Sequence, residues 1–199
     1  PFFFAQEKEH NAKKIYADIM KFFTIITSTI FLTVMIYYDL VEQFIGEDFH
    51  DSRGLVVVPV LLFANLFLGI YYNISVWLKL TEKTRFGAYL ALFGAVITLA
   101  LNFALIPSLG FEGSAWATLI CYFSMTVASY FIGKKHYPIP YDFKRIALYL
   151  GTTLLLFALS IYVDLGTWIN TLYVIIFIGI AYLLERPKKR VNSTPELFD

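Results

Sequence analysis

The chain has 199 residues, of which 58% are hydrophobic, 19% are aromatic and only 16% are charged, with a formal net charge of +1. A soluble domain is usually about 45–50% apolar and about 25% charged. Six long apolar runs in this composition exclude a soluble enzyme, a nucleic-acid-binding protein and a disordered chain.

Six stretches of 17 to 26 residues contain no Asp, Glu, Lys or Arg. About 20 apolar residues in a helix, rising about 1.5 Å each, cross the roughly 30 Å hydrocarbon layer of a membrane. The sequence therefore predicts an all-α integral membrane protein with six transmembrane helices. In chain order the stretches are Phe22–Tyr38, Gly54–Leu78, Phe86–Phe111, Gly113–Gly133, Ile146–Val163 and Leu165–Leu184.

The basic residues alternate with these stretches. If each stretch crosses the membrane once, 15 of the 16 Lys and Arg residues lie on one side, and the other side holds only Arg53 together with seven acidic residues. The positive-inside rule makes the basic side cytoplasmic. The sequence thus predicts a cytoplasmic linker from a preceding helix at residues 1–21, a transmembrane region at residues 22–184 and a cytoplasmic tail at residues 185–199.

Polar residues of the second stretch recur with helical spacing. Asn65, Gly69, Tyr72 and Asn73 are spaced i, i+4, i+7 and i+8, which places them on one face. Two interpretations remain open, because both helix packing and a polar cavity satisfy the amides. We expect this face to point into the bundle interior and to line a substrate path.

Small residues mark the next two stretches. One face of the third stretch carries Gly87, Ala91, Gly94, Thr98 and Asn102, and a face of the fourth carries Ser114, Thr118, Cys121 and Ser124. Small residues let helix backbones approach closely. We therefore expect the third and fourth helices to pack tightly, with Asn102 as a further candidate for the substrate path.

The fifth and sixth stretches are rich in leucine and isoleucine, which predicts peripheral helices that face lipid. No carboxylate lies inside any of the six stretches, and no catalytic, cofactor-binding or metal-ligand spacing occurs. Lys79 and Lys83, four residues apart and followed by Arg85, could contact a phosphate head group from one helix face. Topology-setting charge is the alternative interpretation.

The segment Leu101–Met125, LNFALIPSLGFEGSAWATLICYFSM, resembles a signature of the polysaccharide-biosynthesis branch of the multidrug/oligosaccharidyl-lipid/polysaccharide flippase superfamily. The matching positions are Asn102, Leu105, Ile106, Pro107, Gly110, Gly113, Ala115, Ala117 and Thr118. A conservative departure is Ser114-Ala115, where the family often has Gly-Ala-Ala.

The resemblance implies a bundle of 12 or 14 helices in two lobes, of which these six would be the last. It implies a protein that is not an enzyme and needs no cofactor. Such a protein flips polyprenyl-pyrophosphate-linked oligosaccharides across the bacterial cytoplasmic (inner) membrane for surface polysaccharide synthesis. The implied partners are membrane lipid, the lipid-linked oligosaccharide and the remaining N-terminal helices of the same protein.

Two other functions remain open at this stage. A drug or metabolite antiporter of the same superfamily would use an acidic residue inside the membrane, and these six stretches contain none. A membrane-embedded glycosyltransferase or polymerase would use a large outer loop, and the longest outer link here, residues 39–53, has 15 residues.

Overall fold

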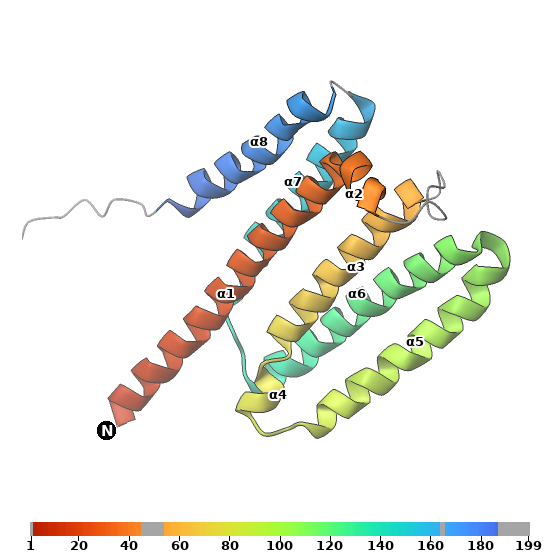
Figure 1. Ribbon diagram of the computed structural model, residues 1–199. Coiled ribbons are helices and arrows are strands. Elements are labelled where there is room, and N and C mark those ends of the chain that lie inside the picture. Colours follow the sequence, from red (N-terminus) through yellow and green to blue (C-terminus); the bar gives the residue numbers. More distant parts are fainter. Residues whose placement is uncertain (1, 45–53, 164–165, 187–199) are drawn as a thin grey trace, which may run out of the picture.

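The computed structural model describes residues 2–44, 54–163 and 166–186, and Figure 1 shows that this part of the chain is helical. Six of its helices are long and apolar enough to cross a membrane, and none of the described residues forms a strand. The predicted fold class, an all-α integral membrane protein with six spans, is confirmed. The helices are α1 (Phe2–Ile36), α2 (Tyr38–Phe44), α3 (Gly54–Ile74), α4 (Trp77–Leu80), α5 (Arg85–Leu109), α6 (Phe111–His136), α7 (Phe143–Tyr162) and α8 (Thr167–Glu185).

Helix extends beyond the predicted transmembrane region at both ends. Residues 2–21 of the predicted linker are helical, because no Gly or Pro interrupts residues 2–36 and α1 runs unbroken from Phe2. Glu185, the first residue of the predicted tail, is the last residue of α8. Pro1 lies outside the described residues. So do residues 187–199, which are most of the predicted tail, and residues 45–53, which are most of the outer link 39–53.

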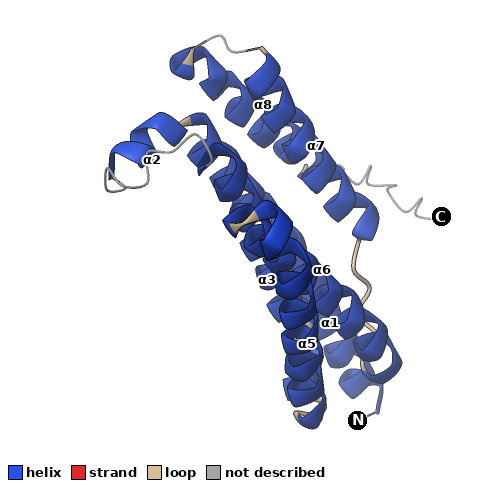
Figure 2. Ribbon diagram, turned by 90° about the vertical axis from the view of Figure 1, so that its right-hand side faces the viewer, coloured by secondary structure: helices blue, strands red, loops and turns tan. Residues whose placement is uncertain are grey.

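Four of the spanning helices lie side by side in the order α1, α3, α6, α5, as Figure 1 shows. Consecutive spans along the chain alternate in direction, so the end of α6 and the start of α5 lie at the same end of the molecule (Figure 1), whereas the neighbours α3 and α6 run in the same direction. Seen on edge in Figure 2, these four helices form one layer, and α7 and α8 lie on one side of it. That pair packs against α1 and against itself.

Two apolar clusters hold the helices together. The larger joins α1, α7 and α8, and the smaller joins α1 and α3 to the first turn of α7. The larger cluster contains Phe31, Leu32, Ile36, Tyr149, Leu156, Val174, Phe177 and Ala181. The smaller one contains Met20, Leu66, Ile70, Ile74 and Ile146. Of the six spans, α5 buries the smallest share of its residues, and α7 and α8 bury a smaller share than α1, α3 and α6.

The α5–α6 hairpin packs through small residues, as predicted. The turn is made at Gly110, whose φ of +60° favours glycine. A Cβ at Gly113 would lie 2.6 Å from the backbone oxygen of Leu105, and a Cβ at Gly94 would meet the Met125 side chain. The Cys121 thiol donates to the Gly94 carbonyl at 3.3 Å. On α6 the buried stripe of Gly113, Ala117 and Cys121 lacks bulk, which lets the backbones approach. On α5 only Gly94 of the predicted stripe is buried, next to Leu90, and Ala91 is exposed.

Candidate substrate path and charged junction

Asn65 and Tyr72 do not point into the interior of these helices. Each residue turns a helix by about 100°, which places Asn65 and Tyr72 opposite Phe67, Ile70 and Ile74. The latter three line a groove toward α7. Asn65 is exposed and Tyr72 is 67% exposed. Within the described helices Asn65 and Tyr72 do not point inward, because α1 and α6 flank α3 and leave one side of the layer uncovered. That this face lines a substrate path in the whole protein stays a prediction.

Gly69 and Asn73 have other surroundings. A Cβ at Gly69 would meet the ring of Phe23, so this glycine lies at the contact between α1 and α3. Asn73 is half-buried, and its amide donates to the Gly69 carbonyl at 3.0 Å. The helical spacing thus places all four residues on one side of α3, but only Asn65 and Tyr72 are exposed on the uncovered side of the layer.

Tyr141, in the loop before α7, donates from its hydroxyl to the backbone oxygen of Asn73 at 3.4 Å. Burial raises the pKa of the Tyr141 phenol above its ordinary value, so the hydroxyl stays protonated at neutral pH. This contact ties the start of α7 to the end of α3.

Asn65 lies near the middle of the charge-free stretch 54–78 and borders a groove of about 150 Å³ between α1 and α3. Thr27 of α1 lines the same groove. The Asn65 amide donates one hydrogen bond, to the Leu61 carbonyl at 2.8 Å, and Thr27 donates to the Phe23 carbonyl at 2.8 Å. We call this surface, with Tyr72, the open face; its Asn65 carboxamide lies near the middle of the span Val56–Leu80.

Asn102 is placed apart from the open face. It lies on α5, which is separated from α3 by α6, and it borders a shallow groove of about 340 Å³ with Leu99 and Phe103. Its side-chain oxygen is buried and has no hydrogen-bond partner among the described residues. The predicted path residues therefore do not converge on one site within this chain.

Lys79, Lys83 and Arg85 are all exposed around the turn between α3 and α5. Lys79 belongs to the short helix α4, which ends at Leu80, and Glu82 follows with a φ of +56°. Lys83 therefore lies beyond the helix. The expectation that Lys79 and Lys83 share a helix face is wrong, because the turn interrupts the helix between them.

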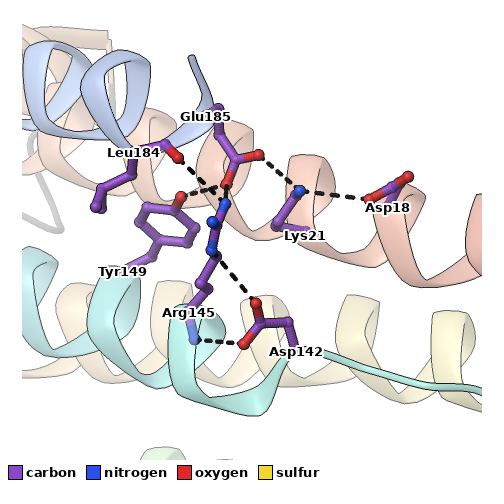
Figure 3. Close-up of polar contacts among 7 residues, drawn as sticks. All are labelled: Asp18, Lys21, Asp142, Arg145, Tyr149, Leu184 and Glu185. Atoms are coloured by element: carbon purple, nitrogen blue, oxygen red, sulfur yellow. Dashed lines mark hydrogen bonds and ion pairs between the residues drawn. The ribbon is translucent and has the colours of Figure 1, made fainter. Parts of the chain in front are cut away.

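A charged junction joins α1, α7 and α8, as Figure 3 shows. The Oε2 atom of Glu185 lies 2.6 Å from the Nζ atom of Lys21. Its Oε1 atom accepts hydrogen bonds from Arg145 and from the hydroxyl of Tyr149, each at 2.7 Å. Each carboxylate oxygen is thus held by a donor from another helix, the arrangement in which charge-assisted hydrogen bonds are strongest.

The junction has a largely buried inner part and a more solvent-exposed outer part. The side chains of Lys21 and Glu185 are 14% and 17% exposed, whereas those of Arg145 and Asp142 are 40% and 49% exposed. Asp142 caps the first turn of α7 by accepting from the Arg145 backbone nitrogen at 3.1 Å, and it pairs with the Arg145 side chain. The inner pair sets the position of α8, and the outer pair sets the start of α7.

The sequence reasoning missed this junction. Glu185 follows directly after the last charge-free stretch, so the sequence alone places it in the cytoplasmic tail. The available signal was that Lys21, Arg145 and Glu185 each border a span on the same predicted side of the membrane. That arrangement predicts a shared depth but not a shared contact.

Comparison with known proteins gives one weak relation. No family model matches the chain, and no solved structure matches it. An uncharacterized membrane protein of Methanocaldococcus jannaschii is 26% identical over 106 residues, which cover 53% of this chain and 26% of that protein. The chain thus spans about a quarter of the length of the curated relative it matches. This relation and the six apolar helices together identify a multi-pass membrane protein.

Proposed function

We propose that this chain is part of a transporter that flips polyprenyl-pyrophosphate-linked oligosaccharides across the bacterial cytoplasmic membrane for surface polysaccharide synthesis. The observation that carries the proposal is the exposed carboxamide of Asn65 near the middle of its span. The Asn65 amide donates one hydrogen bond, to the Leu61 carbonyl of its own helix, and the rest of its carboxamide is exposed. Polar groups left without partners in hydrocarbon cost roughly 2–7 kcal/mol. Asn65 therefore faces a polar path or another part of the protein rather than lipid.

The layer arrangement supports a role as one wall of such a path. One side of α3 is uncovered in these six helices, and α7 and α8 lie on the other side. A second lobe facing the uncovered side would enclose Asn65, Thr27 and Tyr72 between the two lobes. Hydroxyl and amide groups exchange hydrogen bonds with sugars without covalent chemistry, which is what flipping requires.

The charges support the orientation that the proposal needs. With the basic turns in the cytoplasm, Lys79, Lys83 and Arg85 meet the phosphate groups of lipids at that surface. A cysteine placed at Lys135 is then labelled from the cytoplasm, and one at Leu109, beside the α5–α6 turn, from outside. Labelling of both positions from the same side contradicts the orientation.

The charged junction bears on the antiporter alternative. Glu185 is a largely buried carboxylate at the end of α8, although the sequence places it just beyond the last charge-free stretch. Because both of its oxygens are held by donors from α1 and α7, we assign it to structure rather than to proton exchange. It also lies away from the open face, at the junction of the α7–α8 pair with α1.

Asn65→Ala in the full-length protein tests the proposal. We expect polysaccharide export per protein molecule to fall about ten-fold, which corresponds to about 1.4 kcal/mol of lost hydrogen bonding to the sugar. Leu61→Ala, one turn away at 37% exposure, is the matched control and should leave export unchanged. If export falls only in proportion to membrane abundance, Asn65 is structural and the substrate path is elsewhere.

A further inference from the structure

A groove of about 360 Å³ separates α6 from α7, on the opposite side of α3 from Asn65. Its walls include Phe131 of α6 and Phe143 and Ala147 of α7, and Ile70 of α3 forms part of its floor. The proline-containing loop 137–142 leads the chain away from α6 before α7 begins, so the two helices are not closely packed. A hollow with such an apolar lining does not hold ordered water, so in a membrane hydrocarbon fills it.

The basic end of this groove has the chemistry of a membrane interface. The groove adjoins a small hollow, with which it shares Ile74 and Tyr130, and Lys134 and Tyr137 line that hollow. Tyrosine and tryptophan are enriched at head-group level, and lysine attracts anionic lipid there. Trp77 and Tyr141 complete the aromatic lining.

The charge at this end is positive. Lys134 is exposed and forms no ion pair with any of the described residues, and the amino group of Lys13 lies 4.5 Å from the centroid of the Tyr137 ring. Among the described residues no acidic side chain lines the groove or the hollow. A ligand with a hydrocarbon chain and a phosphate group at one end matches both the apolar groove and its basic end.

We propose that the α6–α7 groove is the site of a resident anionic phospholipid, with one acyl chain in the groove and its phosphate at Lys134. The lipid fills the space between the layer and the α7–α8 pair and completes the packing of α7. Because the groove and the open face lie on opposite sides of the layer, this site does not depend on the proposed transport function.

Photo-crosslinking of the full-length protein tests the site. The protein is reconstituted in phosphatidylcholine vesicles that contain phosphatidylglycerol with a photoreactive group on its acyl chain. Cross-linked peptides are then mapped by mass spectrometry. We expect labels on the groove walls around Phe131 and Phe143, and weaker labelling there by a phosphatidylcholine probe of the same design.

Two pairs of variants separate the head group from the chain. Lys134→Gln should lower phosphatidylglycerol labelling of the groove about five-fold, which is the effect of one lysine near an anionic lipid. Lys135 lines neither the groove nor the adjoining hollow, so Lys135→Gln should leave the labelling unchanged. Ala147→Phe fills the groove and should abolish the labelling. Leu148→Phe, on the same helix but outside the groove, should retain it.

Two outcomes overturn the proposal. Equal labelling by both probes, unaffected by Lys134→Gln, means that bulk hydrocarbon fills the groove without head-group recognition. Absence of labels from the groove walls in the unmodified protein means that another protein segment covers them.

Discussion

The α5–α6 hairpin and the α7–α8 pair are both antiparallel helix pairs, but different contacts hold them in place. Within the hairpin, glycine and cysteine bring the two backbones together, and Cys121 contacts a backbone carbonyl directly. The α7–α8 pair is held on α1 by large side chains such as Tyr149 and Phe177, and by the charged junction around Glu185.

The difference follows from where each pair lies. Between neighbouring helices in hydrocarbon there is little hydrophobic driving force, so close van der Waals contact has to stabilise the hairpin. At the basic ends of the helices, charges are closer to the interface and can pair across helices at lower desolvation cost. The hairpin should therefore be sensitive to added volume, and the α7–α8 pair to removed charge.

The largest effect should come from Gly113→Ala in the hairpin. The added methyl group would meet the backbone of Leu105, which cannot rotate away, so we expect a loss of about 3 kcal/mol in stability. Thermal unfolding of the full-length protein, followed by reaction of Cys121 with a fluorescent thiol reagent, measures the change. Gly94→Ala is the matched variant and should cost about 1 kcal/mol, because the flexible Met125 side chain can move. Equal losses would contradict backbone contact as the limiting factor.

Glu185→Gln should have the next largest effect, and on the other pair. The substitution leaves Lys21 and Arg145 without their shared carboxylate and should cost about 2 kcal/mol. Hydrogen exchange measured by mass spectrometry should become faster in α7 and α8 but remain unchanged in α5 and α6. Faster exchange in the hairpin as well would indicate that the two pairs are not independently attached.

Tyr149→Phe removes one of the donors to Glu185 and leaves the ring in the apolar cluster. Because Lys21 and Arg145 still hold the carboxylate, we expect a loss of about 1 kcal/mol. The same exchange experiment should place the effect in α7 and α8. A loss as large as that of Glu185→Gln would mean that the hydroxyl, rather than the two cations, holds the carboxylate.

Asp142→Asn should have the smallest effect. The ion pair with Arg145 is largely solvent-exposed, and an asparagine still accepts the capping hydrogen bond of α7, so we expect less than about 0.5 kcal/mol. Thermal unfolding of the full-length protein measures it. A larger loss would show that the outer part of the charged junction contributes to docking as much as the inner part.

The amino-acid sequence by itself determined the number of spans, their alternation and the close packing of the hairpin. These properties depend on local quantities: the length of an apolar run, the side on which lysine and arginine accumulate, and the size of residues at helical spacing. Gly94, Gly113 and Cys121 could be identified because small residues at helical spacing allow close approach of a neighbouring helix, whichever helix that is.

Only the tertiary structure decided which faces are covered and which charges meet. The spacing of Asn65, Gly69, Tyr72 and Asn73 defines one side of a helix, but the positions of α1 and α6 determine that Gly69 is packed while Asn65 and Tyr72 are exposed. Lys21 and Glu185 lie 164 positions apart in the sequence and meet because α8 packs against α1. Such a contact depends on how whole helices pack, and no local pattern of residues encodes it.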